Sequence, residues 1–212
     1  MSPANFLFYT SALLACANAS AAGKNPDENQ LAMARKLAAS FNQQLTQEII
    51  DTYTRKGPDA AWLVCRDRAP DLADMLSRKY GWRISRISLK PRNVVLGTAD
   101  AWEQRVLNQF EQRAFLGESA KTLEFGDITR DLQGQAYRYM KALVMQEPCL
   151  ACHGAPDNLA PSLKSRIKDA YPHDRATGYR VGQVAGAITI YRPITSPASA
   201  RTSQQGLPAR NK

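Results

Sequence analysis

The chain has 212 residues, of which 44% are hydrophobic and 22% are charged, and its formal net charge is +9. This composition is typical of a folded protein and excludes wholesale disorder, and the length fits one domain with terminal extensions. Nucleic acid is not an expected partner, because the basic residues are scattered among acidic ones and form no recognisable nucleic-acid motif. The positive charge instead favours an acidic protein partner or peripheral association with an anionic membrane surface.

Residues 1–22 predict an export signal. No charged residue precedes Lys24, and an apolar block from Phe6 to Ala15 is followed by small residues. A bilayer span needs about 20 apolar residues, so this shorter block predicts a cleaved signal peptide and a periplasmic protein, although the basic residues that usually open such a signal are missing. The sequence Leu13-Leu14-Ala15-Cys16 also resembles a lipoprotein cleavage box, which makes a lipid anchor on Cys16 the alternative.

Two long helices are expected after the signal. Asp27 can cap the first, whose apolar residues repeat at helical spacing. Gly57-Pro58 ends this helix and starts the second, which Gly81 closes. Pro70 should kink the second helix, because it lacks the amide that would bond to the carbonyl four residues earlier.

Four strands and two further helices are expected after Gly81. They comprise a strand at 82–89, a helix after Asp100, strands at 123–128 and 135–145, a helix at 160–171 and a last strand at 184–191. The first strand breaks its alternation once, which predicts a bulge or a local twist. In the last strand, Val184, Gly186, Ile188 and Ile190 are expected on one face, opposite Thr189. This mixture predicts an α+β domain with an antiparallel sheet over residues 27–193, followed by a disordered tail at 194–212.

The segment Cys149-Leu150-Ala151-Cys152-His153 carries the predicted chemistry. Cys149 and Cys152 can form thioethers with the two vinyl groups of haem, which places His153 under the iron as the proximal ligand. A zinc site would need four ligands, and the chain after the signal offers only three cysteines and two histidines. A redox-active dithiol usually lies in a thioredoxin-like βαβ unit, which the sequence does not indicate. One covalent haem c is therefore the predicted cofactor.

The residues alone leave the second axial ligand of this haem open. Small electron-carrying cytochromes c have a ligating methionine downstream of the motif, but no methionine follows Met145 here. His173 is the other histidine and could complete a bis-histidine pair. Cys65 lies on the apolar face of a predicted helix, where a cysteine is most often inert and buried.

Further short segments occur in a fixed order along the chain. They are Cys65-Arg66-Asp67-Arg68-Ala69-Pro70, Gly81-Trp82-Arg83, Leu89-Lys90-Pro91-Arg92-Asn93, Trp102-Glu103, Pro148 to Gly154, Tyr171-Pro172 with Asp174, Ala176-Thr177-Gly178-Tyr179 and Gly186-Ala187-Ile188. With these segments, the chain resembles a bacterial and cyanobacterial family of single-haem c-type domains over about residues 28 to 193. Two positions depart from the pattern: Val94 stands where a proline often follows the asparagine, and His173 replaces a more usual acidic residue.

This resemblance implies a PAS-like antiparallel sheet with long N-terminal helices, and a haem iron held by His153 and Cys65. It also implies a redox- or gas-responsive sensor module with an unidentified redox or signalling protein as its partner. A periplasmic electron-transfer cytochrome is the alternative. We assign no catalytic residue, because a peroxidase-like enzyme would need an open iron site and distal acid–base groups that the sequence does not indicate. Four basic residues could pair with the haem propionates or form a solvated strand edge: Arg83, Arg86, Lys90 and Arg92.

Overall fold

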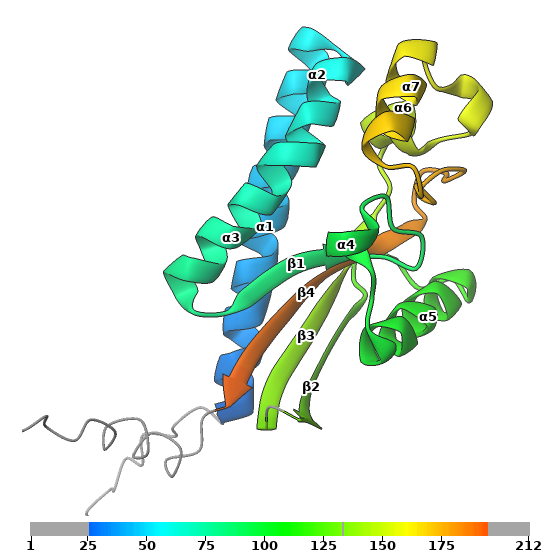
Figure 1. Ribbon diagram of the computed structural model, residues 1–212. Helices are drawn as coiled ribbons and strands as arrows, with labels where there is room; N and C mark the ends of the chain where they lie inside the picture. Colours follow the sequence, from blue (N-terminus) through cyan, green and yellow to red (C-terminus); the bar gives the residue numbers. More distant parts are fainter. Residues whose placement is uncertain (1–25, 133, 195–212) are drawn as a thin grey trace, which may run out of the picture.

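The computed structural model describes residues 26–132 and 134–194. The predicted signal peptide, Cys16 and almost all of the predicted disordered tail lie outside these residues. In the described part, a four-stranded antiparallel sheet carries helices on both faces, and a small helical lobe formed by residues 147–170 lies at one end (Figure 1). This architecture confirms the predicted α+β fold with its long N-terminal helix.

Two antiparallel helical segments open the fold. Helix α1 spans Pro26–Lys56, and the returning segment consists of α2 (Pro58–Leu63), the π turn η1 (Val64–Arg68) and α3 (Ala69–Tyr80). Gly57 and Gly81 have positive φ values at the two ends of the returning segment, as expected for residues that punctuate helices. The disturbance predicted at Pro70 is present, but it takes the form of a widened turn just before the proline.

The sheet has the strand order β1-β4-β3-β2, and every neighbouring pair is antiparallel. Its strands are β1 (Arg83–Ile87), β2 (Glu124–Asp131), β3 (Gly134–Val144) and β4 (Val184–Ile194). The two long strands β3 and β4 lie in the middle, and their central residues are buried on both faces. The sheet therefore supports one hydrophobic core on each side.

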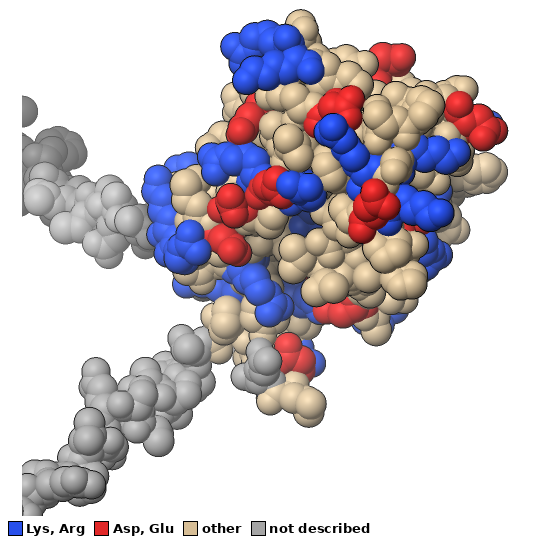
Figure 2. Space-filling model, turned by 45° about the horizontal axis from the view of Figure 1, so that its top comes forward, with Lys and Arg blue, Asp and Glu red and all other residues tan. Residues whose placement is uncertain are grey.

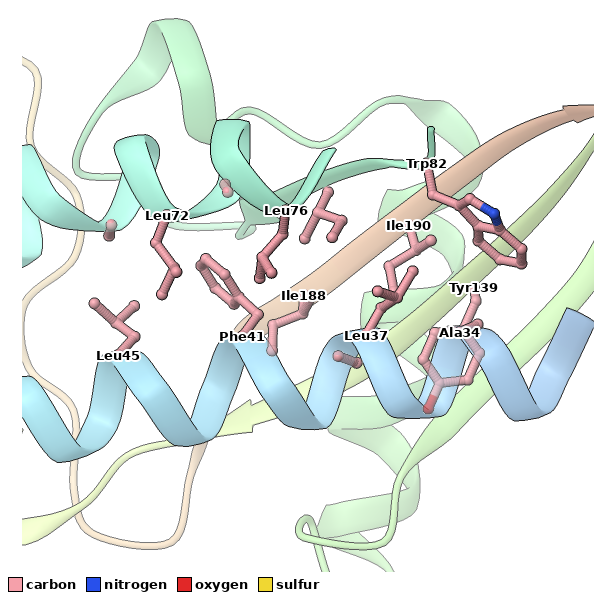
Figure 3. Close-up of a cluster of buried hydrophobic side chains, with 14 of the residues drawn as sticks. Ala34, Leu37, Phe41, Leu45, Leu72, Leu76, Trp82, Tyr139, Ile188 and Ile190 are labelled. Carbon is pink, nitrogen blue, oxygen red and sulfur yellow. The ribbon is translucent and has the colours of Figure 1, made fainter. Parts of the chain in front are cut away.

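One core fills the space between the sheet and the helices α1 and α3 (Figure 3). Leu37 and Phe41 of α1 face Leu72 of α3 and Ile188 of β4, and all four are at most 1% exposed. Burial of side chains of this size contributes about 1.5–3 kcal/mol each. The other core contains Phe110 and other side chains from α5, together with residues from the opposite face of the sheet.

Burial on both faces explains why apolar residues do not alternate regularly along β1. Ile84 packs in the core under α1 and α3, whereas Ile87 packs in the core under α5. The pairing of β1 with β4 is continuous from Arg83↔Tyr191 to Ile87↔Ala187. Of the bulge or local twist predicted for this strand, the bulge is therefore wrong, because the pairing with β4 is unbroken and the two isoleucines pack on opposite covered faces.

A bulge does occur in β4. Leu143 pairs with Gly186 and Val144 pairs with Val184, so the register skips Ala185. Val184 consequently packs in the α5 core, while Ile188 packs in the α1 core, and the prediction that they share a face is wrong. The bulge brings Gly186 so close to β1 that a Cβ atom there would lie 2.3 Å from the carbonyl oxygen of Ile87.

The remaining helices connect these strands. They are α4 (Val94–Gly97), α5 (Ala101–Phe115), η2 (Glu147–Cys149), α6 (Leu150–His153), η3 (Pro156–Asn158) and α7 (Pro161–Ala170). Asp100 and Glu103 form a capping box at the start of α5, as the predicted Asp100 cap requires. Glu103 also accepts a hydrogen bond from Thr189 of β4 and pairs with Arg138 of β3, which attaches α5 to the sheet.

Charges of both signs are interspersed over the face shown in Figure 2. The mixed pattern agrees with the scattered basic residues in the sequence. None of the helices within residues 26–132 and 134–194 combines the length and the hydrophobicity that a membrane span needs.

Candidate functional site

A cavity of about 370 Å³ lies where the helical lobe meets the returning helical segment and the end of the sheet. In Figure 1 this is the end at which α2 and α6 lie near each other, and these two helices are in contact. Cys65, Cys149, Cys152 and His153 all line this cavity. The structure thus brings the distant Cys65 to the cysteine–histidine motif. Ligand pockets commonly have volumes of about 300–1,000 Å³.

The end of β3 positions the motif. After Val144 the chain is held by Gln183 and Gly182, because the Met145 amide donates to the Gln183 carbonyl and the Met145 carbonyl accepts from the Gly182 amide. The short helices η2 and α6 then present the motif, and the Gly154 amide donates to the Leu150 carbonyl. A Cβ atom at Gly154 would lie 2.6 Å from that carbonyl oxygen, so only glycine fits the exit of the motif without a shift.

One hydrogen bond fixes the imidazole of His153. Its Nδ1 lies 2.7 Å from the carbonyl oxygen of Ala176. Because a carbonyl can only accept, Nδ1 carries the proton and Nε2 keeps its lone pair. Burial, together with the positive charge of Arg92, lowers the pKa of His153 to about 3, so the ring is neutral near pH 7. A neutral imidazole whose other nitrogen donates to a carbonyl is the usual form of a metal-ligating histidine.

A buried ion pair holds the segment that supplies this carbonyl. Arg92 Nε donates to Asp174 Oδ2 at 3.0 Å, and the two side chains are 12% and 11% exposed. Arg92 Nη2 donates to the carbonyls of Cys152 and Ala176, while Asp174 Oδ1 accepts from the Ala176 amide. Arg92 therefore connects the motif to the segment that orients His153.

The backbone adds two direct links between these segments. The Tyr179 amide donates to the His153 carbonyl, and the Gly178 amide donates to the Gly154 carbonyl. The Tyr179 ring also meets the His153 ring edge to face at 6.4 Å. Sequence reasoning gave no role to Asp174, Ala176 or Tyr179, although all three belong to the short segments that carry the family resemblance.

Cys65 lies in the π turn η1 and is partly exposed toward the cavity. Burial raises the pKa of its thiol, while the positive charge of Arg86 acts in the opposite direction. Arg86 Nη2 also donates to the carbonyl of Cys65 at 3.2 Å. All three cysteines of the described chain are free thiols.

The four basic residues predicted to lie together do not share one role. Arg83 is absent from the cavity wall and stacks over Tyr191 at 4.5 Å. Lys90 and Arg92 line the cavity but are engaged with the protein, Lys90 through the carbonyl of Thr177 and Arg92 as described above. Arg86 also lines the cavity, and within the described chain it forms no ion pair with a carboxylate.

The alternative ligands are placed differently. His173 is exposed and does not line the cavity, whereas Met145 is buried and does. Among residues 26–132 and 134–194, no three His, Cys, Asp or Glu side chains lie close enough together to hold a bare metal ion.

Trp62 adds an unpaired donor to the cavity wall. It is 4% exposed and packs against Leu163 and Cys152 in a small core between α2 and α7. Its indole N–H is buried and has no acceptor in the described part of the chain. Buried donors are normally paired, so the indole N–H of Trp62 suits a bound group that carries acceptor oxygens.

Comparison with known proteins gives a consistent result. The family model described as Tll0287-like matches residues 20–193. Among solved structures, the crystal structure of the cyanobacterial heme-protein Tll0287 is similar, with 25% sequence identity and a TM-score of 0.58. The match covers 80% of this chain and 96% of that chain. No curated protein matches. Because the family model spans most of the chain, the resemblance seen in the separated segments is confirmed, and this protein belongs to the Tll0287-like family.

Proposed function

We propose that this protein is an exported, periplasmic c-type monohaem protein that works as a redox- or gas-responsive sensor. Cys149 and Cys152 hold one haem through thioethers, His153 is the proximal ligand and Cys65 is the second axial ligand. The observation that carries this proposal is the hydrogen bond from His153 Nδ1 to Ala176, because it leaves Nε2 free as a ligand in a cavity that the three cysteines also line. The relationship to a heme-protein of the same family supports it.

The residues of the cavity fit this cofactor. A largely apolar wall suits the porphyrin, and the unpaired indole N–H of Trp62 suits a carboxylate oxygen of the haem. Bound haem supplies an iron that takes up one electron and, when a ligand leaves, offers a position for a small gas molecule. The protein's own contribution is to orient His153 and to present Cys65.

The cysteine ligand carries the switching role in this proposal. A thiolate donates charge strongly to ferric iron and lowers its reduction potential. Burial already raises the pKa of Cys65, so the free thiol is the stable form when the bond to iron is weakened. Cys65 would therefore take up one proton from solvent as it leaves the iron and would remain on the cavity wall as a neutral thiol. An electron-transfer cytochrome is the alternative function, and it would keep both ligands in both oxidation states.

Spectroscopy of haem-loaded protein tests the proposal. The protein is expressed with a cytochrome c maturation system, and wild type is compared with Cys65→Ala, Met145→Leu and His173→Ala. We expect covalent haem in all four proteins and a low-spin ferric thiolate signal that only Cys65→Ala loses. Met145→Leu is the matched control, since Met145 lines the same cavity and leucine has a similar volume.

The outcomes separate the possible functions. Absence of covalent haem would refute the whole proposal, and an unchanged spectrum of Cys65→Ala would refute Cys65 as a ligand. We expect the ferrous wild-type protein to bind carbon monoxide as Cys65 detaches. A high potential with rapid electron exchange and no carbon monoxide binding would favour the electron carrier.

The cellular location is tested by fractionation. We expect the mature protein in the soluble periplasmic fraction, with residues 1–22 removed. If a lipid on Cys16 anchors the protein instead, it will appear in the membrane fraction, and Cys16→Ala will release it.

A further inference from the structure

The π turn and Pro70 together deprive the carbonyl oxygen of Cys65 of its helical backbone donor. In a regular α-helix it would accept from the Ala69 amide, but in the π turn that amide donates to the Val64 carbonyl. The next amide would belong to residue 70, and Pro70 has none. A partly buried carbonyl in this position requires a donor from elsewhere. The proline thus leaves an unpaired acceptor on the residue that carries the candidate ligand.

Arg86 supplies that donor from the sheet. Its Nη2 lies 3.2 Å from the Cys65 carbonyl oxygen. Arg86 belongs to β1, where it pairs with Ile188 of the central strand β4, so its backbone is held by the sheet. Within the described residues its guanidinium makes no ion pair, which leaves the Cys65 carbonyl as its hydrogen-bond partner.

We propose that Arg86 is the positioning residue of the Cys65 ligand. By pairing the carbonyl that Pro70 leaves without a donor, it stabilises the π turn and fixes the Cys65 side chain on the cavity wall. A π turn that relaxes to regular α-helix turns the affected residue by about 100° around the helix axis, the rotation of one residue. The role of Cys65 as an iron ligand rests on the proposed function, whereas the link between Arg86 and the π turn does not.

The link is tested first without haem. The apo protein is treated with iodoacetamide over a range of pH, and alkylation of the Cys65 peptide is followed by mass spectrometry. The rate constant of the thiolate is taken from the pH profile, because loss of the Arg86 charge raises the pKa of Cys65 and slows the reaction at any fixed pH. We expect Arg86→Met to raise this rate constant by about three- to tenfold, the effect of losing one hydrogen bond. Arg86→Lys, which keeps a donor, should show a smaller increase. Arg83→Met is the matched control, because Arg83 lies on the same strand but outside the cavity.

Pro70→Ala provides an independent check. Alanine at position 70 restores a backbone amide that can pair with the carbonyl left open in the π turn. In this background we expect Arg86→Met to have little further effect on the alkylation rate, since the carbonyl no longer depends on Arg86. If the two substitutions act additively, or if neither Arg86→Met nor Arg86→Lys differs from Arg83→Met, the proposed link is wrong.

Haem-loaded protein separates this inference from the proposed function. We expect Arg86→Met to weaken the low-spin thiolate signal and Cys65→Ala to abolish it. A signal unchanged in Cys65→Ala refutes the ligand role of Cys65, and the alkylation assay then decides on the link alone. A signal lost in Cys65→Ala but unchanged in Arg86→Met refutes Arg86 as the positioning residue.

Discussion

The buried ion pair between Arg92 and Asp174 should be essential for the stability of the candidate site. Replacing Asp174 with alanine leaves the guanidinium of Arg92 without its carboxylate in a place where the side chain is only 12% exposed. It also removes the acceptor of the Ala176 amide at 2.8 Å. Loss of one partner of a buried pair costs about 3–5 kcal/mol, because the other charge stays buried. We expect Asp174→Ala to lower the free energy of unfolding by this amount.

Urea denaturation of the apo protein measures the effect. With a slope of about 2 kcal/mol per molar urea, the expected loss lowers the midpoint by about 2 M. Asp174→Asn keeps the shape and an acceptor oxygen but not the charge, so it should fall between wild type and Asp174→Ala. Glu48→Ala is the control, since it breaks an ion pair with Arg68 in which both side chains are more than 40% exposed, and such pairs contribute about 0–1 kcal/mol.

The result that would refute this reasoning is equal stability of Asp174→Ala and Glu48→Ala. It would mean that solvent reaches Arg92 and that the ion pair does not hold the segment carrying Ala176. NMR of the His153 ring gives a second measurement. We expect Asp174→Ala to loosen the Nδ1 hydrogen bond to Ala176 and to allow both tautomers.

Two further predictions concern the sheet and the start of α5. Gly186→Ala should destabilise the protein by about 3 kcal/mol or more, because φ is +154° and the new Cβ would meet the Ile87 carbonyl. Gly182→Ala is the control, because Gly182 also has a positive φ but lies in open space, and it should cost about 1–2 kcal/mol. Equal losses of stability in thermal denaturation would argue against the close approach of Gly186 to Ile87. Although burial alone would raise the pKa of Asp100, hydrogen bonds from the Glu103 amide and from Arg138 lower it. The resulting stabilisation is present above the unfolded pKa of about 3.9 and is lost as the pH falls through the lower folded value. Asp100→Asn keeps a good helix cap but removes the charge. The unfolding free energy of this variant should lie up to about 1 kcal/mol below that of wild type at pH 6, and the difference between the two proteins should disappear below pH 4. A difference that persists at pH 2 would contradict the charge effect.

Local interactions made much of this protein predictable from its sequence. The Asp100 capping box and the Gly81 helix end depend on neighbouring residues, and both are present in the structure. The spacing of Cys149, Cys152 and His153 is likewise a property of five consecutive residues, so the cofactor could be proposed without knowledge of the fold. Pro70 likewise predicted a disturbed helix, because its missing amide affects only the neighbouring turn.

The irregular apolar pattern of β1 could not be interpreted from local sequence alone. Alternation along one strand shows which residues are apolar, but whether a break means a bulge or two covered faces depends on what packs against each face. Here α3 covers Ile84 and α5 covers Ile87, and the bulge lies instead at Ala185 in β4.

The surroundings of the candidate ligands were decided by tertiary structure alone. Only the folded chain brings Cys65 to the cavity wall that His153 also lines. Folding also places the carbonyl of Ala176 beside Nδ1 of His153. It places Arg86 beside the Cys65 carbonyl, for which Pro70 supplies no amide. Two of these partners are backbone carbonyls, which every residue has, so no residue type signals them in the sequence. The motif therefore specifies which side chains can hold the iron, whereas packing between distant segments specifies how they are oriented.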